Sequence, residues 1–217
     1  MAGSLIPILW QDDALLVVDK PVGLLVVPAP GRHAPTVVDL VSAQLGERVH
    51  AVHRLDEETS GVLVLARTDA SKRWLEDVFK EHRATRTYLA LVEHTPSPPA
   101  GRIESRLREV AGGMVHTVTR PPGELAITVY RVLGRRGKQT LVECQPQTGR
   151  RNQIRVHMRD LGCPLCGDRK YGWRTRGTPF DRLMLHAERI VLPRAEGRPS
   201  VNVQVDAREV ALRRDPS

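Results

Sequence analysis

The 217-residue sequence is poor in cysteine, in aromatic residues and in long apolar runs. Its three cysteines, an odd number, argue against a framework of disulfide bonds. No apolar segment approaches the roughly 20 residues that span a bilayer, and no basic stretch precedes an apolar one at the N-terminus. These absences argue against a disulfide-stabilised secreted domain and a helical membrane protein, and they predict a cytoplasmic location.

Lysine is also scarce. Of the 33 cationic residues five are lysines and 28 are arginines, and the formal net charge is +8. A positively charged surface attracts polyanions, and arginine binds phosphate through two parallel hydrogen bonds. A coding bias toward arginine would explain the ratio of arginine to lysine but not the net charge. We therefore predict a nucleic-acid partner.

Two of the cysteines form a C-x-x-C pattern, Cys163-Pro164-Leu165-Cys166. A structural zinc site would need two further ligands, and Cys144 is the only other thiol. A redox pair is the alternative, but isolated pairs of this kind are more often small buried residues. We interpret the pair as part of the core.

Short apolar segments of strand length are frequent, and helical periodicity is confined to three segments. We expect strands at residues 14–18, 24–27, 61–66, 87–92, 115–119, 125–133, 140–144, 185–192 and 201–205. We expect helices at 37–45, between Thr36 and Gly46, at 69–82 and at 150–161. Strands without regular βαβ alternation predict an α+β fold with a mixed, largely antiparallel sheet flanked by helices and loops. The proline-rich segment 94–101 is interpreted as a loop within one domain.

The densest polar cluster is His53-Arg54-Leu55-Asp56-Glu57-Glu58-Thr59-Ser60-Gly61, directly before an apolar strand. A loop that leads into a buried strand is a good place to fix a reactive group, and a nearby guanidinium would favour the ionised form of Asp56. A surface turn with an ion pair explains the spacing equally well. Ser60 lacks the G-x-S-x-G elbow of hydrolases, and no second histidine completes a metal site.

A second polar cluster runs from Thr148 to Arg159. On a helix, Arg151, Arg155 and Arg159 would share one face beside an apolar one. A solvated arginine face is common. A row of unpaired cations next to Arg150, however, would repel itself unless phosphates or carboxylates lay opposite. The cluster is thus a candidate phosphate-binding surface.

These two clusters together resemble the RluA-type pseudouridine synthases. His53-Arg54-Leu55-Asp56 with Thr59-Ser60-Gly61 is similar to the family's HRLDxxTSG signature. Further similar motifs follow in the family's order: Asp19 to Leu24, Arg86 to Ala90, Thr148 to His157, Gly162 to Gly172 and Arg182 to Ala187. The resemblance implies the pseudouridine synthase fold, with a catalytic cleft across the sheet, as a single catalytic domain over residues 1–217. It also implies a monomer. From the sequence we expect no separate N-terminal RNA-binding module of the kind that some relatives carry.

The resemblance implies an isomerase that converts uridines of structured RNA, either rRNA or tRNA, to pseudouridine. The reaction needs no cofactor and no metal, because no electrons leave and no group is imported. By resemblance Asp56 is the catalytic carboxylate, Arg155 pairs with it, and Tyr88 stacks on the extruded base. Arg54 resembles an arginine that occupies the space of the flipped nucleotide.

The remaining residues of the two clusters are predicted to contact RNA; they are His53, Arg150, Arg151 and Arg159. Three positions depart from the family's motifs. Asn152 replaces a histidine, Arg86 replaces a lysine, and Cys163 stands where histidine is frequent. None of the three is a predicted catalytic residue, so these departures bear on the choice of substrate.

Two other functions stay open from the residues. A non-catalytic RNA-binding protein on the same scaffold would bind RNA without isomerising it. A metal-dependent nuclease or phosphatase would use Asp19, Asp56 and His53 as ligands and would depend on divalent ions.

Overall fold

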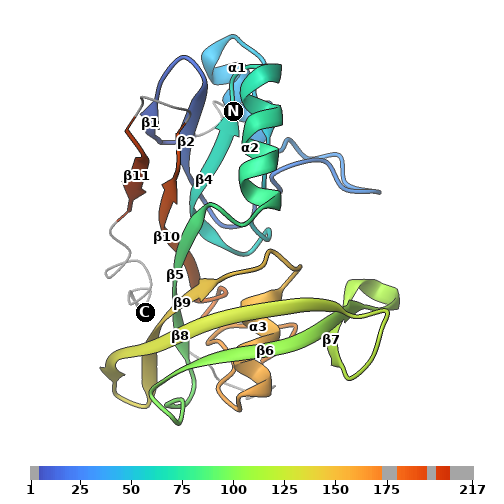
Figure 1. The fold of residues 1–217 in the computed structure, drawn as a ribbon, viewed down its shortest axis with the longest axis vertical. Coiled ribbons are helices and arrows are strands. Elements are labelled where there is room, and N and C mark those ends of the chain that lie inside the picture. The colour runs from blue at the N-terminus through green and yellow to red at the C-terminus, as the bar shows by residue number, and fades with distance from the viewer. Residues whose placement is uncertain (1–4, 173–179, 195–198, 206–217) are drawn as a thin grey trace. The chain divides into compact units, whose positions relative to one another are not determined.

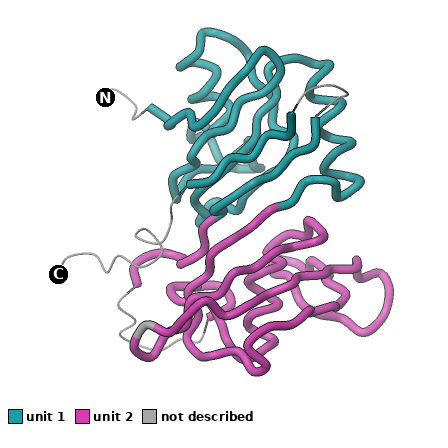
Figure 2. The backbone as a smooth tube through the Cα atoms, turned by 60° about the vertical axis from the view of Figure 1, so that its left-hand side comes forward, with its two compact units in different colours: residues 1–85, 187–205 teal, residues 86–186, 206–217 magenta. Residues whose placement is uncertain are grey.

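The computed structural model describes residues 5–172, 180–194 and 199–205. The chain forms two compact units, coloured separately in Figure 2. Unit 1 comprises Met1–Thr85 and Ala187–Val205, and unit 2 comprises Arg86–His186 and Asp206–Ser217. The chain therefore leaves unit 1 at the start of one strand and re-enters it within another. A single catalytic domain over residues 1–217 stays a prediction.

Unit 1 is a sheet with two helices (Figure 1). Its strands are β1 (Ile8–Gln11), β2 (Leu15–Lys20), β3 (His50–Ala51), β4 (Ser60–Ala66), β10 (Leu185–Leu192, from Ala187 onward) and β11 (Val201–Gln204). The order is β1-β2-β4-β10, with β11 paired to β10 and β3 paired to β4. The β1–β2, β2–β4, β3–β4 and β10–β11 pairs are antiparallel. The loop that carries Asp56 joins the short β3 to the buried β4.

The helices of unit 1 begin and end where local sequence chemistry directs. In α1 (Val37–Leu45), Thr36 and Asp39 form a capping box, and Gly46 closes the helix in the left-handed conformation. In α2 (Asp69–Lys80), Thr68 caps the helix together with Ser71. These caps satisfy backbone N–H groups that have no partner within the helix.

The core of unit 1 lies between the sheet and α2. Side chains of β2, β4, β10 and β11 pack against Leu75 and Val78 of α2, and Trp74 and Phe79 lie at the margin of this cluster. All seven residues of β4 are buried. Gly61 allows β10 to approach closely, because a Cβ there would lie 2.2 Å from the carbonyl oxygen of Ala187. The strand that follows Asp56 is thus a rigid part of the molecule.

The described part of unit 2 contains five antiparallel strands and one α-helix. Its strands are β5 (Thr85–Val92, from Arg86 onward), β6 (Ala100–Glu109), β7 (Val115–Val118), β8 (Glu124–Arg136) and β9 (Gln139–Pro146), in the order β5-β9-β8-β6-β7. These four neighbouring pairs are antiparallel. Helix α3 (Gln153–Asp160) packs Val156 against residues of β6, β7 and β8, and a short 3₁₀ helix covers Ala111–Gly113. The long strands β6 and β8 run side by side in Figure 1. The predicted α+β fold is confirmed.

The structure differs from the predicted elements in several places, and β1 and β3 were not predicted. Residues 24–27 form no strand, because the carbonyls of Leu25 and Val26 accept hydrogen bonds from the first turn of α1 instead. Strand β6 was not expected, since Ile103 and Leu107 are its only large apolar residues. Helix α3 begins at Gln153 rather than at 150, so Arg150 and Arg151 precede the helix. No helix in the described part of the chain is long and apolar enough to cross a membrane.

Candidate active site

Asp56 lies in the loop between β3 and β4, at the first position of a tight turn. The N–H of Thr59 donates to the carbonyl of Asp56 at 3.0 Å and closes the turn. Leu55, the preceding residue, is buried and anchors the loop in the core, while Asp56 itself is half-buried. The carboxylate is therefore carried by a fixed backbone that still reaches the surface.

A second constraint on this turn is the side chain of Lys20, which is 0% exposed. Its ammonium donates to the carbonyls of Pro21 at 2.9 Å, Glu57 at 3.1 Å and Thr59 at 2.9 Å. The N–H of Gly23 adds a bond of 2.9 Å to the carbonyl of Glu57. The end of β2 thus fixes the backbone on the C-terminal side of Asp56.

Lys20 also places a buried positive charge near Asp56. Burial lowers the pKa of Lys20 from 10.5 to about 8, and the carboxylates of Asp56 and Glu57 act in the opposite direction. The ammonium and the Asp56 carboxylate therefore favour each other's charged forms. The sequence predicted no role for Lys20 beyond its motif, because its three acceptors are backbone groups that a side-chain pattern does not reveal.

The lowered pKa of Lys20 predicts how stability depends on pH. Between pH 8 and 10.5 the unfolded chain binds more protons at Lys20 than the folded chain does, so stability rises with pH in this window. The full rise is about 3 kcal/mol. Urea unfolding of the wild type and of Lys20→Met from pH 7 to 10.5 measures it, because other titrating groups cancel in the difference. A difference that stays constant with pH would contradict the buried charge.

His53 is held by contacts within unit 1. Its Nε2 accepts the N–H of Val64 at 3.0 Å, and its ring stacks on Phe79 with the centroids 4.3 Å apart. An Nε2 that accepts a backbone N–H is not available to a metal ion or a phosphate. Arg54, by contrast, is exposed to solvent. His53 and Arg54, which precede Asp56 in the motif, therefore have different environments.

In unit 2, Arg155 forms a buried ion pair with Asp168. Its Nε and Nη2 donate to the two carboxylate oxygens at 2.8 and 2.7 Å, and the two side chains are 3% and 1% exposed. Tyr171 lies against the guanidinium, with Arg155 Cζ 5.2 Å from the ring centroid. Asp168 belongs to the motif from Gly162 to Gly172. No role was predicted for it, because it lies 13 residues from Arg155 in the sequence.

Tyr88 lies on β5 and is 8% exposed. It stands opposite Cys144 in the register with β9. Tyr88 and Arg155 thus belong to unit 2, whereas Asp56 belongs to unit 1. The predicted pairing of Asp56 with Arg155 remains a prediction.

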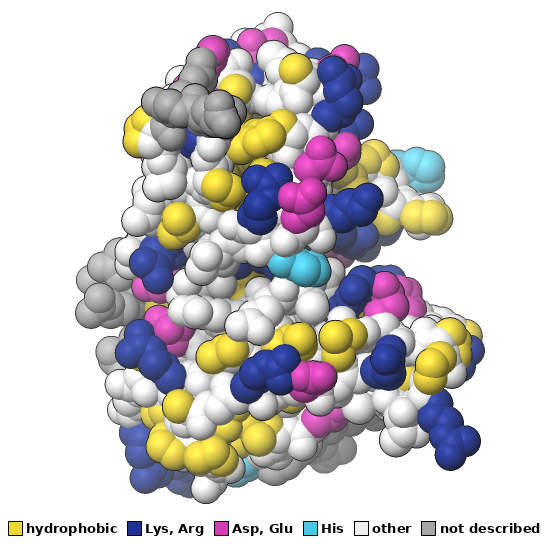
Figure 3. All heavy atoms as spheres, in the orientation of Figure 1, with side chains coloured by type: hydrophobic (Ala, Val, Ile, Leu, Met, Phe, Trp, Pro, Cys, Tyr) yellow, Lys and Arg dark blue, Asp and Glu magenta, His cyan; other side chains and the backbone are white. Residues whose placement is uncertain are grey.

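The arginines of the second cluster are not a row of unpaired cations, contrary to the sequence-based expectation. Arg150 pairs with Glu124 at 2.5 Å, Arg151 with Glu109, and Arg159 with Asp160 at 2.6 Å. Figure 3 shows acidic side chains interspersed with arginine and lysine on the face that it presents. Charge repulsion therefore gives no argument for phosphate binding at these three residues.

A buried polar network fixes α3 on the sheet. Gln153 accepts from the hydroxyl of Thr148 at 2.7 Å and donates to the carbonyl of Ile127 at 2.8 Å. The ring nitrogens of His157 contact the hydroxyls of Thr128 at 2.9 Å and Ser105 at 3.0 Å. Burial lowers the pKa of His157 to about 4, so the ring is neutral at neutral pH. The network sets the rotation of the helix that carries Arg155.

The three cysteines are free and buried, which confirms the prediction that Cys163 and Cys166 belong to the core. Burial raises the pKa of the Cys144 thiol to about 12 and also raises that of Cys166. Among the described residues, no group of three His, Cys, Asp or Glu side chains is placed to hold a metal ion. The thiols are core groups rather than a reactive pair.

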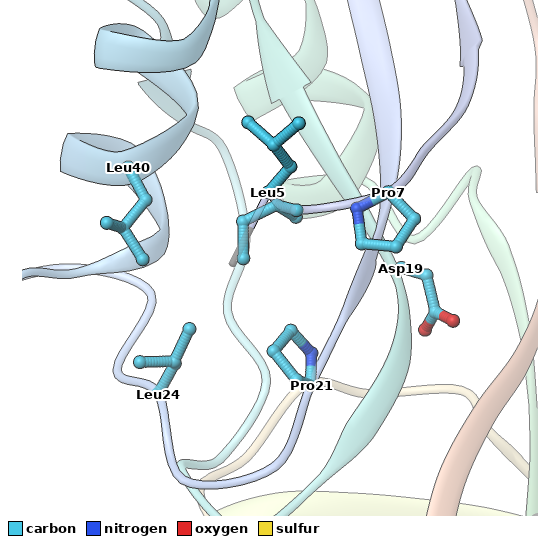
Figure 4. Close-up of a pocket in the computed structure, with 7 residues that line it drawn as sticks. Leu5, Pro7, Asp19, Pro21, Leu24 and Leu40 are labelled. Atoms are coloured by element: carbon cyan, nitrogen blue, oxygen red, sulfur yellow. The ribbon is translucent and has the colours of Figure 1, made fainter. Parts of the chain in front are cut away.

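An apolar pocket of about 420 Å³ lies elsewhere in unit 1 (Figure 4). It is lined by Leu5, Ile6, Pro7, Asp19, Pro21, Leu24 and Leu40. Burial raises the pKa of Asp19, the single ionisable group of this lining. The pocket lacks cationic side chains and does not include Asp56, so it differs in character from a phosphate-binding cleft.

The family model for RNA pseudouridylate synthases matches residues 14–160. An uncharacterized RNA pseudouridine synthase of Bacillus subtilis, YlyB, is 40% identical over 189 residues, which are 83% of this chain and 62% of the relative. The dual-specificity RNA pseudouridine synthase RluA of Escherichia coli is 38% identical over 190 residues, 85% of each chain. The chain spans about three fifths of the length of YlyB and of a similar Aquifex aeolicus relative.

Solved structures agree with these sequence matches. The human RNA pseudouridylate synthase domain containing 4 superposes with a TM-score of 0.76 at 30% identity, covering 92% of this chain and 88% of that one. The human RNA pseudouridylate synthase domain containing 1 superposes with a TM-score of 0.79 at 26% identity. The superposition covers 94% of this chain and 85% of that one. The backbone described above is thus shared with these human proteins.

Proposed function

Because the chain belongs to the RNA pseudouridylate synthase family, we propose that it isomerises selected uridines of structured RNA to pseudouridine, with Asp56 as the catalytic carboxylate and without a cofactor. The observation that carries the proposal is the Asp56 turn. It lies within the matched residues, and the buried ammonium of Lys20 fixes its backbone and favours its charge. A carboxylate held ionised on a rigid turn suits a reaction in which positive charge develops nearby.

The reaction breaks the N1–C1′ bond of uridine and forms a C5–C1′ bond in its place. The uracil turns between the two steps, its C5 loses a proton, and N1 gains one, so that atoms and electrons balance. Positive charge develops at C1′ as the first bond opens. Asp56 either attacks C1′ or stabilises this charge, as carboxylates do in glycoside hydrolysis, or it assists a path through a glycal.

Tyr88 and Arg155 complete the proposed active site. The Tyr88 ring offers an apolar face for the extruded base, and Arg155 holds Asp56 ionised and oriented. A buried guanidinium is suited to this role because it keeps its charge in every environment of the protein. The domain formed by residues 1–217 is proposed to act as one catalytic unit and as a monomer.

The proposed RNA contacts differ in strength. Arg54 is exposed beside Asp56 and can enter the space that a flipped nucleotide leaves. To bind a phosphate, each of three arginines would have to give up an ion pair with a carboxylate: Arg150, Arg151 and Arg159. Each therefore contributes less to RNA affinity than Arg54 does. His53 can contact RNA only through its Nδ1, since its Nε2 accepts a backbone N–H.

The proposed substrate is rRNA or tRNA. Relatives in Rickettsia bellii and Borreliella burgdorferi, 35% and 33% identical, are named ribosomal large subunit pseudouridine synthases C and D. The Escherichia coli relative is named dual-specificity. The net charge of +8 suits either polyanion. A cytoplasmic location, where such RNA is present and thiols stay reduced, belongs to the same proposal.

Pseudouridine mapping across total RNA tests the proposal. Cells without this protein should lose pseudouridine at one or a few positions, and the purified chain should restore it on an unmodified transcript that contains the position. Expression of Asp56→Asn in the deletion strain is the control, and it should restore nothing. An unchanged map, together with no product on rRNA or tRNA transcripts, would contradict the proposal. RNA binding without product would favour a non-catalytic RNA-binding protein.

A further inference from the structure

A contribution to the stability of the fold does not by itself explain why Arg155 and Asp168 form a buried ion pair. Both side chains are almost fully buried, and the two hydrogen bonds are short and parallel. Removing two charges from water is costly, and apolar residues of similar volume often stabilise a core as well or better. The pair instead fixes the orientation of the Arg155 guanidinium, because two parallel hydrogen bonds determine its plane.

The loop that carries Asp168 is itself rigid. One carboxylate oxygen accepts the N–H groups of Lys170 and Tyr171, both at 2.9 Å, in addition to Arg155. Gly167 and Gly172 have no room for a side chain, since a Cβ would lie 1.8 Å from the carbonyl oxygen of Arg182 and 2.2 Å from that of Asp168. Backbone packing therefore fixes the position of the Asp168 carboxylate independently of Arg155.

Tyr171 restrains the same guanidinium from another side. Its hydroxyl accepts the N–H of Val115 and the side-chain amide of Asn152, each at 2.9 Å, which fixes the ring. The centroid of this ring lies 5.2 Å from Cζ of Arg155. Asn152, which departs from the family's motif, thereby contributes to the orientation of Tyr171. Asp168 and Tyr171 of unit 2 therefore both restrain the guanidinium.

We propose that Asp168 is a positioning residue for the isomerisation: it holds Arg155 by Nε and Nη2 in the orientation in which Arg155 acts on Asp56. The inference rests on the proposed function. Asp168 and Tyr171, both of unit 2, orient the guanidinium, so its direction is fixed before RNA binds. Such preorganisation means that no reorientation is needed as charge develops at C1′.

Two substitutions separate position from charge. Asp168→Asn removes the charge, whereas Asp168→Glu keeps the charge but moves it by one methylene. We expect the single-turnover rate of pseudouridine formation to fall about 100-fold in the first and at least about 10-fold in the second, with RNA affinity within about threefold of the wild type. The rates are compared at a temperature where each variant is folded by circular dichroism. Should Asp168→Asn not fold, Asp168→Glu carries the test.

Glu143→Gln is the matched control. Glu143 binds Arg131 in the same two-bond geometry, at 3.1 and 3.0 Å, but Arg131 is exposed. This variant should keep the wild-type rate. A folded Asp168→Glu with the wild-type rate would overturn the inference while the activity of the wild type upholds the proposed function. An inactive wild type would instead contradict the proposed function itself.

A spectroscopic readout does not depend on turnover. In ¹⁵N-labelled protein the Arg155 guanidinium, assigned by its loss in Arg155→Lys, should rotate slowly about its Nε–Cζ bond. Rotation should speed up at least about 10-fold in Asp168→Glu, because the parallel bonds no longer fit. Rotation unchanged in the variant would show that Asp168 does not hold Arg155 and would overturn the inference.

Discussion

Replacement of Asp56 by asparagine should lower the rate of pseudouridine formation at least about 10³-fold, a loss typical of a catalytic carboxylate. Asparagine has the same shape but cannot attack C1′ or carry the charge that stabilises it. The turn should persist, because Lys20 and Thr59 bond to backbone carbonyls rather than to the Asp56 side chain. RNA affinity should therefore stay within about threefold of the wild type.

Single-turnover assays on a transcript with the mapped uridine, combined with filter binding, measure both quantities. Glu57→Gln is the matched control, since Glu57 is the next carboxylate in the loop and binds Arg32 at 2.7 Å near the surface. It should keep the rate within about threefold, because its backbone contacts are unchanged. An asparagine variant that still forms pseudouridine at the wild-type rate would remove Asp56 from the mechanism.

The second large effect is expected for Gly61→Ala, as a loss of stability. Gly61 has φ +109°, and a Cβ would lie 2.2 Å from the carbonyl oxygen and 2.9 Å from the amide nitrogen of Ala187. Both neighbours are backbone atoms of β10, which cannot move without opening the sheet. We expect the free energy of unfolding to fall by at least about 3 kcal/mol. Urea denaturation followed by circular dichroism measures it.

Gly46→Ala separates the close contact from the backbone conformation. Gly46 also has a positive φ, +68°, but a Cβ there meets nothing within 4 Å. Its substitution should cost only about 1 kcal/mol, the strain of a left-handed alanine. Equal losses in the two variants would mean that conformation alone, and not the approach of β4 to β10, requires glycine in the Asp56 motif.

Local chemistry explains which elements could be predicted. Thr36 and Gly46 bound α1 as expected, because capping involves residues that are close in sequence. The expected strand at residues 24–27 is absent because its carbonyls bond to α1, a contact that no local pattern encodes. Strand β6 was missed because Ile103 and Leu107 are its only large apolar residues, and its pairing with β8 identifies it.

The candidate site shows the same division. The sequence alone determined the family, through motifs in a shared order, and with it Asp56, Tyr88 and Arg155 as candidates. Only the tertiary structure showed that Lys20 holds the Asp56 turn from 39 residues away and that Asp168 holds Arg155. It also paired Arg150, Arg151 and Arg159 with carboxylates and bound His53 to Val64. Residue types state which bonds are available, but the partner of a buried polar group is decided by which segments the fold brings within about 3 Å of it.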